Sequence, residues 1–416
     1  MNVIARRVGN MARRREKAWR WEHWGVVPDR ETQLALAAEL EVSEELLHTQ
    51  PWPDWLPVGD PIRVDFSWDQ SGSTIALNHT LEKAMMDRRG FMRLTGMSLA
   101  GFATDWLNVE PAQLVAVLRG GRITEEFVAQ IEVSLPRLHT LGDIYGGQQV
   151  RKLLDAELGM VAEVLEKSSY NAAIAQRFHG LAAELGSMAG FASFDTGLHS
   201  AAQRYWIAAV HSAHTAGDRA VGANILKSMA LQCRDFGDFP GSLTIARAAY
   251  ESAGKVTPRT ASMLAMRLAW AHASIGDKAE SHRLLSIADT QFGHGTRPDD
   301  PRWVLWFDEG EFHNHIGACQ LDLGNLRRAD FHLDKAREGF SPTRRRDYAT
   351  YLIRRAHVQN DLGNADHAGD LLHQAVPVIE HAPSQRNISK LLAVRDRLPN
   401  GTHRSGLDQR LSTLTG

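Results

Sequence analysis

One stretch of the sequence carries aromatic and ionisable side chains at helical spacing. Trp303 and Trp306 lie three residues apart and would share one face of a helix. Asp308, Glu311 and His315 follow at spacings of three and four and would share another face. Such a helix could form one wall of a binding groove whose carboxylates receive a peptide amine or a basic side chain. The open alternative is that the tryptophans belong to the core and the acids form a solvated face.

No catalytic or metal-binding pattern accompanies this stretch. The sequence contains no glycine-rich phosphate loop, no nucleophile elbow and no zinc spacing of cysteine and histidine. His313 and His315 flank Asn314 as in a nuclease tripeptide, but on a helix their rings would point about 200° apart. His211 and His214 have no third ligand nearby in the sequence. We therefore expect a protein that is not an enzyme and that holds no metal and no cofactor.

The elements that position these residues follow from an internal repeat. Five times along the chain, a glycine is followed five residues later by alanine or serine and seven residues after that by alanine. The sets are Gly197/Ala202/Ala209, Gly237/Ser242/Ala249, Gly276/Ser281/Ala288, Gly324/Ala329/Ala336 and Gly363/Ala368/Ala375. Glycine suits the turn between two helices, and small residues let those helices approach closely. Repeated helical hairpins bury their apolar faces only against their neighbours, so the pattern predicts a stacked all-α array.

These units resemble the tetratricopeptide repeat (TPR) family, as in the segments LGNLRRADFHLDKA and LGNADHAGDLLHQA. Successive glycines are 40, 39, 48 and 39 residues apart, so helices or connections are longer than in the usual repeat of about 34 residues. The resemblance implies that residues 171–398 form a TPR-like α-solenoid that ends in a capping helix. It also implies a concave groove lined by the first helix of each hairpin.

The N-terminal 25 residues are basic, with seven lysine and arginine residues against two glutamates. The segments IARRVG, AWRWE and PDRETQLALAAELEVSEELL resemble the helix-turn-helix domain of the XRE/Cro-like family, truncated before its first helix. The resemblance implies a partial DNA-binding domain over residues 1–50, with a recognition helix in the major groove. It implies base or phosphate contacts from seven side chains, which are Arg13, Arg14, Arg15, Glu16, Lys17, Arg20 and His23.

The remaining segments connect or follow these two parts. Three prolines and two tryptophans at 51–57 are typical of a linker, which we place at residues 51–80. Within it, residues 62–66 alternate as in a short strand or an extended chain. We expect a helical connecting region at 81–170 and a flexible tail at 399–416. The apolar stretch after Arg88-Arg89 resembles a twin-arginine export signal, so export remains a third alternative.

The whole-chain composition favours the interior of the cell. The net charge is -2, there are two cysteines, and no apolar run reaches the roughly 18 residues of a membrane span. Together the two halves resemble actinobacterial helix-turn-helix/TPR transcriptional regulators. They imply a cytoplasmic homodimer that binds promoter DNA and holds a peptide, a small-molecule effector or a partner protein in its TPR groove. The alternative is a TPR adaptor with a degenerate head that binds no DNA.

Overall fold

The structure is a computed structural model that describes residues 27–39, 62–84, 125–145, 147–167, 170–340, 344–399 and 402–411. The chain divides into two compact units, residues 1–62 with 88–93 and residues 63–87 with 94–416. In the first unit the description covers helix α3 (Arg30–Glu39), where the Asp29 side chain accepts a hydrogen bond from the Thr32 N–H at 2.8 Å. The seven predicted DNA-contacting side chains at 13–23 lie outside the described residues.

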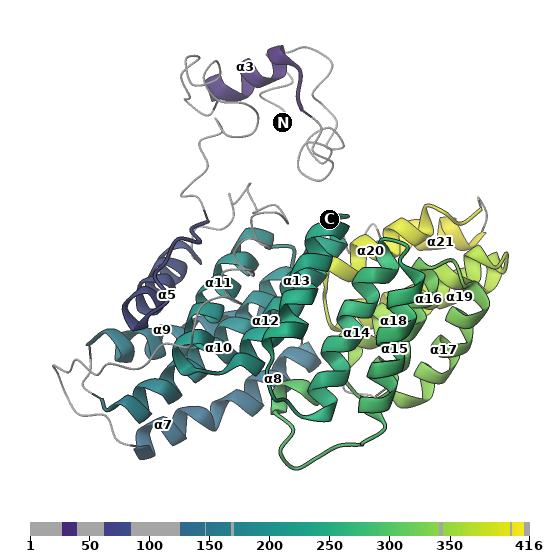
Figure 1. The fold of residues 1–416 in the computed structure, drawn as a ribbon. Helices are drawn as coiled ribbons and strands as arrows, with labels where there is room; N and C mark the ends of the chain where they lie inside the picture. The colour runs from purple at the N-terminus through teal and green to yellow at the C-terminus, as the bar shows by residue number, and fades with distance from the viewer. Residues whose placement is uncertain are drawn as a thin grey trace. The chain divides into compact units, whose positions relative to one another are not determined.

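All regular secondary structure in the described part of the second unit is helical, without strands (Figure 1). The helices that precede the repeats are α5 (Gln70–Ala84), α7 (Glu125–Glu132), α8 (Ser134–Tyr145) and α9 (Gly147–Lys167). The structure corrects the predicted linker at 51–80, because α5 begins inside it and packs on the array. Ser73 Oγ lies 3.2 Å from Ser212 Oγ. Residues 62–67 are extended and pair with no strand among the described residues.

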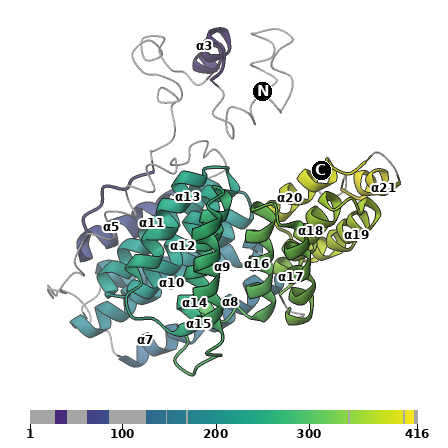
Figure 2. The same cartoon turned by 45° about the vertical axis from the view of Figure 1, so that its right-hand side comes forward.

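Five helical hairpins follow and confirm the predicted array (Figures 1 and 2). They are α10 (Ala172–Asp195) with α11 (His199–Ala216), α12 (Arg219–Asp235) with α13 (Phe239–Ser252), α14 (Pro258–Ser274) with α15 (Lys278–Phe292), α16 (Glu309–Asp322) with α17 (Leu326–Gly339), and α18 (Arg345–Asp361) with α19 (Ala365–His381). The architecture is a TPR-like α-solenoid.

The repeated glycines and small residues occupy the places that the pattern predicts. All five glycines have positive φ, between 72° and 87°, a backbone region that L-residues with a side chain rarely adopt. At Gly324 the turn is closed by the Asn325 N–H, which donates to the Gln320 carbonyl at 2.8 Å. The ten alanine and serine positions of the pattern are at most 1% exposed, so they lie where the paired helices meet.

The end of the chain returns to the first hairpin. After the repeats come α20 (Gln385–Arg395), at the place of the predicted capping helix, and α21 (Thr402–Leu411). The predicted flexible tail is corrected over 402–411, because Leu407 and Leu411 are buried in the core of α19 and its neighbours. Just before α20, Ser384 Oγ donates to Asp195 Oδ1 of α10 at 2.8 Å.

No helix in the described ranges combines the length and the apolar character that crossing a membrane requires.

Candidate functional site

A cavity of about 340 Å³ lies where the first helices of the five hairpins converge. Side chains of α10, α12, α14, α16 and α18 line it, together with residues of α8, α9, α20 and the segment before α16. This agrees with the groove that the TPR resemblance implies. Its volume falls at the lower end of the range of small-molecule sites, about 300–1,000 Å³.

Helical spacing brings the cavity-lining side chains to one face of each first helix. On α12 the lining residues are Val221, Asn224, Lys227, Ser228 and Leu231, which follow the three- and four-residue spacing of one helix face. On α14, Arg267 and Trp270 have the same relation, and on α18 the lining residues include Thr350 and Arg354. A cavity with both aromatic and cationic walls is the result.

The predicted helix over 303–315 is corrected at its start. Arg302–Val304 forms the short 3-10 helix η2, and α16 begins only at Glu309. Asp308 is the N-cap of α16, because its side chain accepts a hydrogen bond from the Glu311 N–H at 3.0 Å. Trp303 and Trp306 therefore precede α16 rather than sharing a face of it, yet both line the cavity with Glu311 and His315. Asp308 is outside the lining set.

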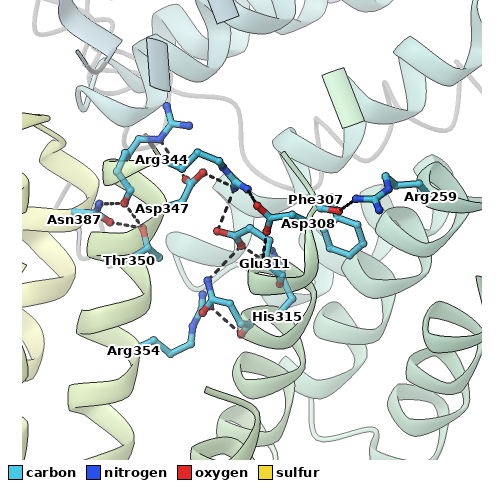
Figure 3. Close-up of polar contacts among 12 residues, drawn as sticks. Arg259, Phe307, Asp308, Glu311, His315, Arg344, Asp347, Thr350, Arg354 and Asn387 are labelled. Carbon is cyan, nitrogen blue, oxygen red and sulfur yellow. Dashed lines mark hydrogen bonds and ion pairs between the residues drawn. The ribbon is translucent and has the colours of Figure 1, made fainter. Parts of the chain in front are cut away.

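The predicted acids are already paired with a cation of the chain itself (Figure 3). The Arg344 guanidinium lies 2.5 Å from Asp308 Oδ2, 2.8 Å from Asp347 Oδ2 and 3.6 Å from Glu311 Oε1. Burial opposes the charge on Arg344, but these three carboxylates raise its pKa above the ordinary value. The expectation that Asp308 and Glu311 receive an external amine is therefore corrected, since Arg344 occupies that position.

His315 completes this cluster as a neutral imidazole. Its Nδ1 lies 2.9 Å from the Glu311 carbonyl oxygen and 3.1 Å from Glu311 Oε2, so Nδ1–H is placed to donate to them. Burial lowers the pKa of His315 below its ordinary range, although Glu311 opposes that shift. The imidazole edge also packs against Trp270 at a centroid distance of 5.5 Å. His315 therefore orients the cluster without adding charge to it.

Lys227 and Arg267 are buried cations of the cavity wall that form no ion pair with a described residue. Lys227 is 6% exposed, and its Nζ lies 4.7 Å from the centre of the Trp306 ring. Arg267 is 5% exposed, and its Nε and Nη1 have no hydrogen-bond partner among the described residues. Burial lowers the pKa of Lys227 to about 7, with Arg267 adding to the shift and Asp347 opposing it. Burial and the neighbouring arginines likewise lower the pKa of Arg267 to about 9, with Asp235 opposing the shift.

The cavity wall as a whole carries an excess of positive charge. Seven lysine and arginine side chains line it, Lys227, Arg267, Arg302, Arg344, Arg346, Arg354 and Arg386, against the three acids Glu184, Glu311 and Asp347. Burial raises the pKa of Glu184 to about 7, with the carboxylates of Asp218 and Glu132 adding to the shift, so this acid is only partly ionised at neutral pH.

Sequence reasoning missed the buried cations, although a signal was present. Lys227 and Arg267 each interrupt an otherwise apolar or small-residue helical segment, NILKSMAL and LAMRLAWA. A lysine or arginine is seldom fully buried without a partner, so a lone cation on the apolar face of a predicted helix points to a site. No group of three or more metal-ligating side chains occurs within the described ranges.

Comparisons with known proteins identify no family. No protein-family model matches the chain, and no curated protein matches it. A solved structure described as the crystal structure of APC/C hetero-tetramer Cut9-Hcn1 is similar over 76% of this chain at 15% sequence identity, with a TM-score of 0.38. This chain covers 52% of that structure's chain, about half its length.

Proposed function

We propose that the chain is a regulator whose helical-repeat array binds a ligand in the cavity between its first helices. The observation that carries the proposal is the pair of buried cations, Lys227 and Arg267, which face a cavity without an ion-pair partner. A buried unpaired charge costs folding stability, and groups of this kind gather at functional sites.

The placement of the cavity supports a regulatory role for the ligand. Residues of all five hairpins line it, so one ligand contacts the whole length of the repeat region. Such a ligand would favour the curvature of the array in which these contacts are best made. It shifts the equilibrium between two curvatures only by its difference in affinity for them.

More specifically, we propose that the chain is a cytoplasmic transcriptional regulator. Its support is the basic N-terminal segment and its resemblance to a helix-turn-helix domain, with Arg15 and Arg20 at base-contacting positions. Two copies of such a domain bind half-sites one helical turn apart, so a homodimer is part of the proposal. Promoter DNA is the expected nucleic-acid partner.

A titration of the full chain with fragments from its own promoter region tests the DNA-binding part. We expect the logarithm of the binding constant to fall linearly with the logarithm of salt concentration. We expect the Arg15→Ala/Arg20→Ala double variant to bind at least about tenfold more weakly, because two charged contacts are lost. Equal binding by the variant, or none by the wild type, would count against this part.

The alternative is an adaptor that acts through protein contact alone. The array itself favours it, because stacked hairpins present an extended surface to protein partners. An adaptor predicts no sequence-dependent DNA binding at any salt concentration, even when the cavity binds a ligand. The same titration therefore separates the two functions.

A further inference from the structure

We propose that the cavity binds an organic acid, a carboxylate or phosphate attached to an apolar body that carries a ring. Lys227 and Arg267 would contact the anion, and Trp270, Trp303 and Trp306 would lie beside the ring. The inference rests on the proposed ligand-binding role of the array and names the chemical class of its ligand.

Arg267 is the first step of the argument. It lies on the buried face of α14, between Met266 and Leu268, and is 5% exposed. No carboxylate of the described residues forms an ion pair with it, and its guanidinium lies over the Trp270 ring, 5.0 Å from the ring centre. A guanidinium presents a planar fork that matches a carboxylate or phosphate, and its Nε and Nη1 are buried here without a hydrogen-bond partner. An anion in the cavity would supply the missing partner.

Lys227 is the second cation, on the neighbouring helix α12. Its ammonium lies over Trp306 and has no ion pair with a described residue. Asp347 is the acid that opposes the lowering of the Lys227 pKa. Asp347 itself pairs with Arg344 at 2.8 Å and with Arg346 at 3.4 Å. Arg267 adds to the lowering of the Lys227 pKa, so an anion bound between the two would stabilise the charge on Lys227.

The acids of the cavity wall leave no internal counter-ion for this pair. Glu311 is held by Arg344 and by the His315 imidazole, and Asp347 is held by two arginines. Glu184, the third acid of the wall, is only partly ionised at neutral pH because burial raises its pKa. Neither cation therefore has an ion-pair partner in the cavity wall. Asp235 acts on the charge of Arg267 from a longer distance, and Lys227 is only partly charged at neutral pH. An anion from outside the chain would supply a direct partner.

The rest of the lining selects the body of the ligand. Val150, Leu154 and Met188 face the cavity along with the three tryptophans. Tryptophan faces favour flat, ring-bearing groups, and the volume of about 340 Å³ suits a compact molecule. Two sources share this chemistry, a free small acid and the C-terminal carboxylate of a peptide that ends in an aromatic residue.

Calorimetric titration of the full chain tests the inference with probes that share a body and differ in charge. The probes are 2-naphthoate, 2-naphthyl phosphate, the neutral 2-naphthamide and 2-naphthylmethylammonium. N-acetyl-Gly-Phe and its C-terminal amide form a second pair that represents a peptide end. We expect the acids to bind at least about tenfold more tightly than the amides, because charge-assisted hydrogen bonds are lost, and the ammonium not at all. Tighter binding of the naphthyl acids assigns a free small acid, whereas tighter binding of the acetylated dipeptide acid assigns a peptide end.

Two variants remove the charges while keeping side-chain volume. In Lys227→Met and Arg267→Met we expect acid binding to fall at least about tenfold while the unfolding temperature stays equal or rises. A purely structural role would instead lower the unfolding temperature. Lys278→Met and Arg247→Met, at exposed positions of α15 and α13, are the matched controls and should bind as the wild type does.

Each outcome decides between the inference and the proposed function. If the amides bind as tightly as the acids, or if both variants bind acids like the wild type, the anion site is overturned but the cavity remains a ligand site. If no probe binds at concentrations up to ten millimolar (about the weakest range that calorimetry resolves), both the anion site and the ligand-binding role are overturned.

Discussion

Arg267 and Arg344 are the same residue type in one cavity wall, yet their surroundings shift the pKa of the guanidinium in opposite directions. Arg344 lies close to three carboxylates, and Arg267 has none within ion-pair distance among the described residues. Arg344→Met would leave Asp308 and Asp347 without this partner, so we expect a loss of about 3–5 kcal/mol in the free energy of unfolding. Arg267→Met removes an unpaired charge and should cause no loss. Urea denaturation of both variants at pH 7 measures the two changes in the free energy of unfolding. Equal losses in the two variants would contradict the prediction.

The Lys227 ammonium gives the stability of the protein a dependence on pH. The groups that act on its charge are Arg267 of α14 and Asp347 of α18, with the Trp306 ring over the ammonium. Its pKa is about 7 in the folded protein and near 10.5 when unfolded, so the unfolded chain binds more protons between these values. The penalty for burying this charge is therefore full below pH 7 and disappears as the pH rises toward 10.5.

Lys227→Met should isolate this effect. We expect the variant to be more stable than the wild type by about 1–4 kcal/mol at pH 6, and the difference to shrink steadily between pH 7 and 10. Denaturant unfolding over that pH range measures it, with Lys278→Met as the control. A difference that is constant over the range would show that Lys227 keeps an ordinary pKa.

At the level of the helices, the hairpin turns depend on backbone conformation rather than on space. A Cβ added at Gly324 would meet no atom within 4 Å, but the residue has a φ of +72°. Gly180, inside α10, has equally open surroundings and a helical backbone. We expect Gly324→Ala to destabilise the protein by about 1–2 kcal/mol and Gly180→Ala to stabilise it by about 0.5–1 kcal/mol. Thermal unfolding measures whether each substitution lowers or raises the unfolding temperature. A shift in the same direction for both variants would contradict this account.

Gly324 and its counterparts also show how far the sequence could predict the fold. Turn conformation and close helix contact are local requirements, so the spacing of glycine and alanine was enough to place all five hairpins. The start of α16 was placed too early, because aromatic spacing at Trp303 and Trp306 was given more weight than the capping residue Asp308. The cavity joins residues of many helices, and no local pattern predicts which buried cations share it.

For the molecule as a whole, ion pairs hold the end of the array against its beginning. Asp235, at the end of α12, lies 2.9 Å from Lys390 Nζ and 3.7 Å from Arg386 Nη1 of α20. Burial raises the pKa of Asp235, but Lys390, Arg386 and Arg234 outweigh it and lower the value to about 2. The ion pairs of Asp235 therefore contribute fully to the free energy of unfolding above the ordinary carboxylate pKa, and this contribution is lost as the pH falls toward 2.

Asp235→Asn should therefore weaken the attachment of α20. We expect a loss of about 3–5 kcal/mol at pH 7 and faster hydrogen exchange in α20 than in α13, since one member of a buried ion-pair cluster is removed. The difference in the free energy of unfolding between the variant and the wild type should become smaller between pH 4 and pH 2. Unchanged exchange in α20 would mean that Ser384 and the apolar contacts hold this helix without Asp235.

The contact of Ser384 with Asp195 has a consequence for how this protein can evolve. An open row of repeats gains or loses a unit at little cost, because each unit touches only its neighbours. Here the residues after the fifth hairpin must reach the first, 189 positions earlier in the chain. A duplicated hairpin would carry α20 away from α10, and a deleted one would leave no room for the cavity. We therefore expect this contact to constrain the number of hairpins, so that new specificity comes from substitutions among the residues that line the cavity.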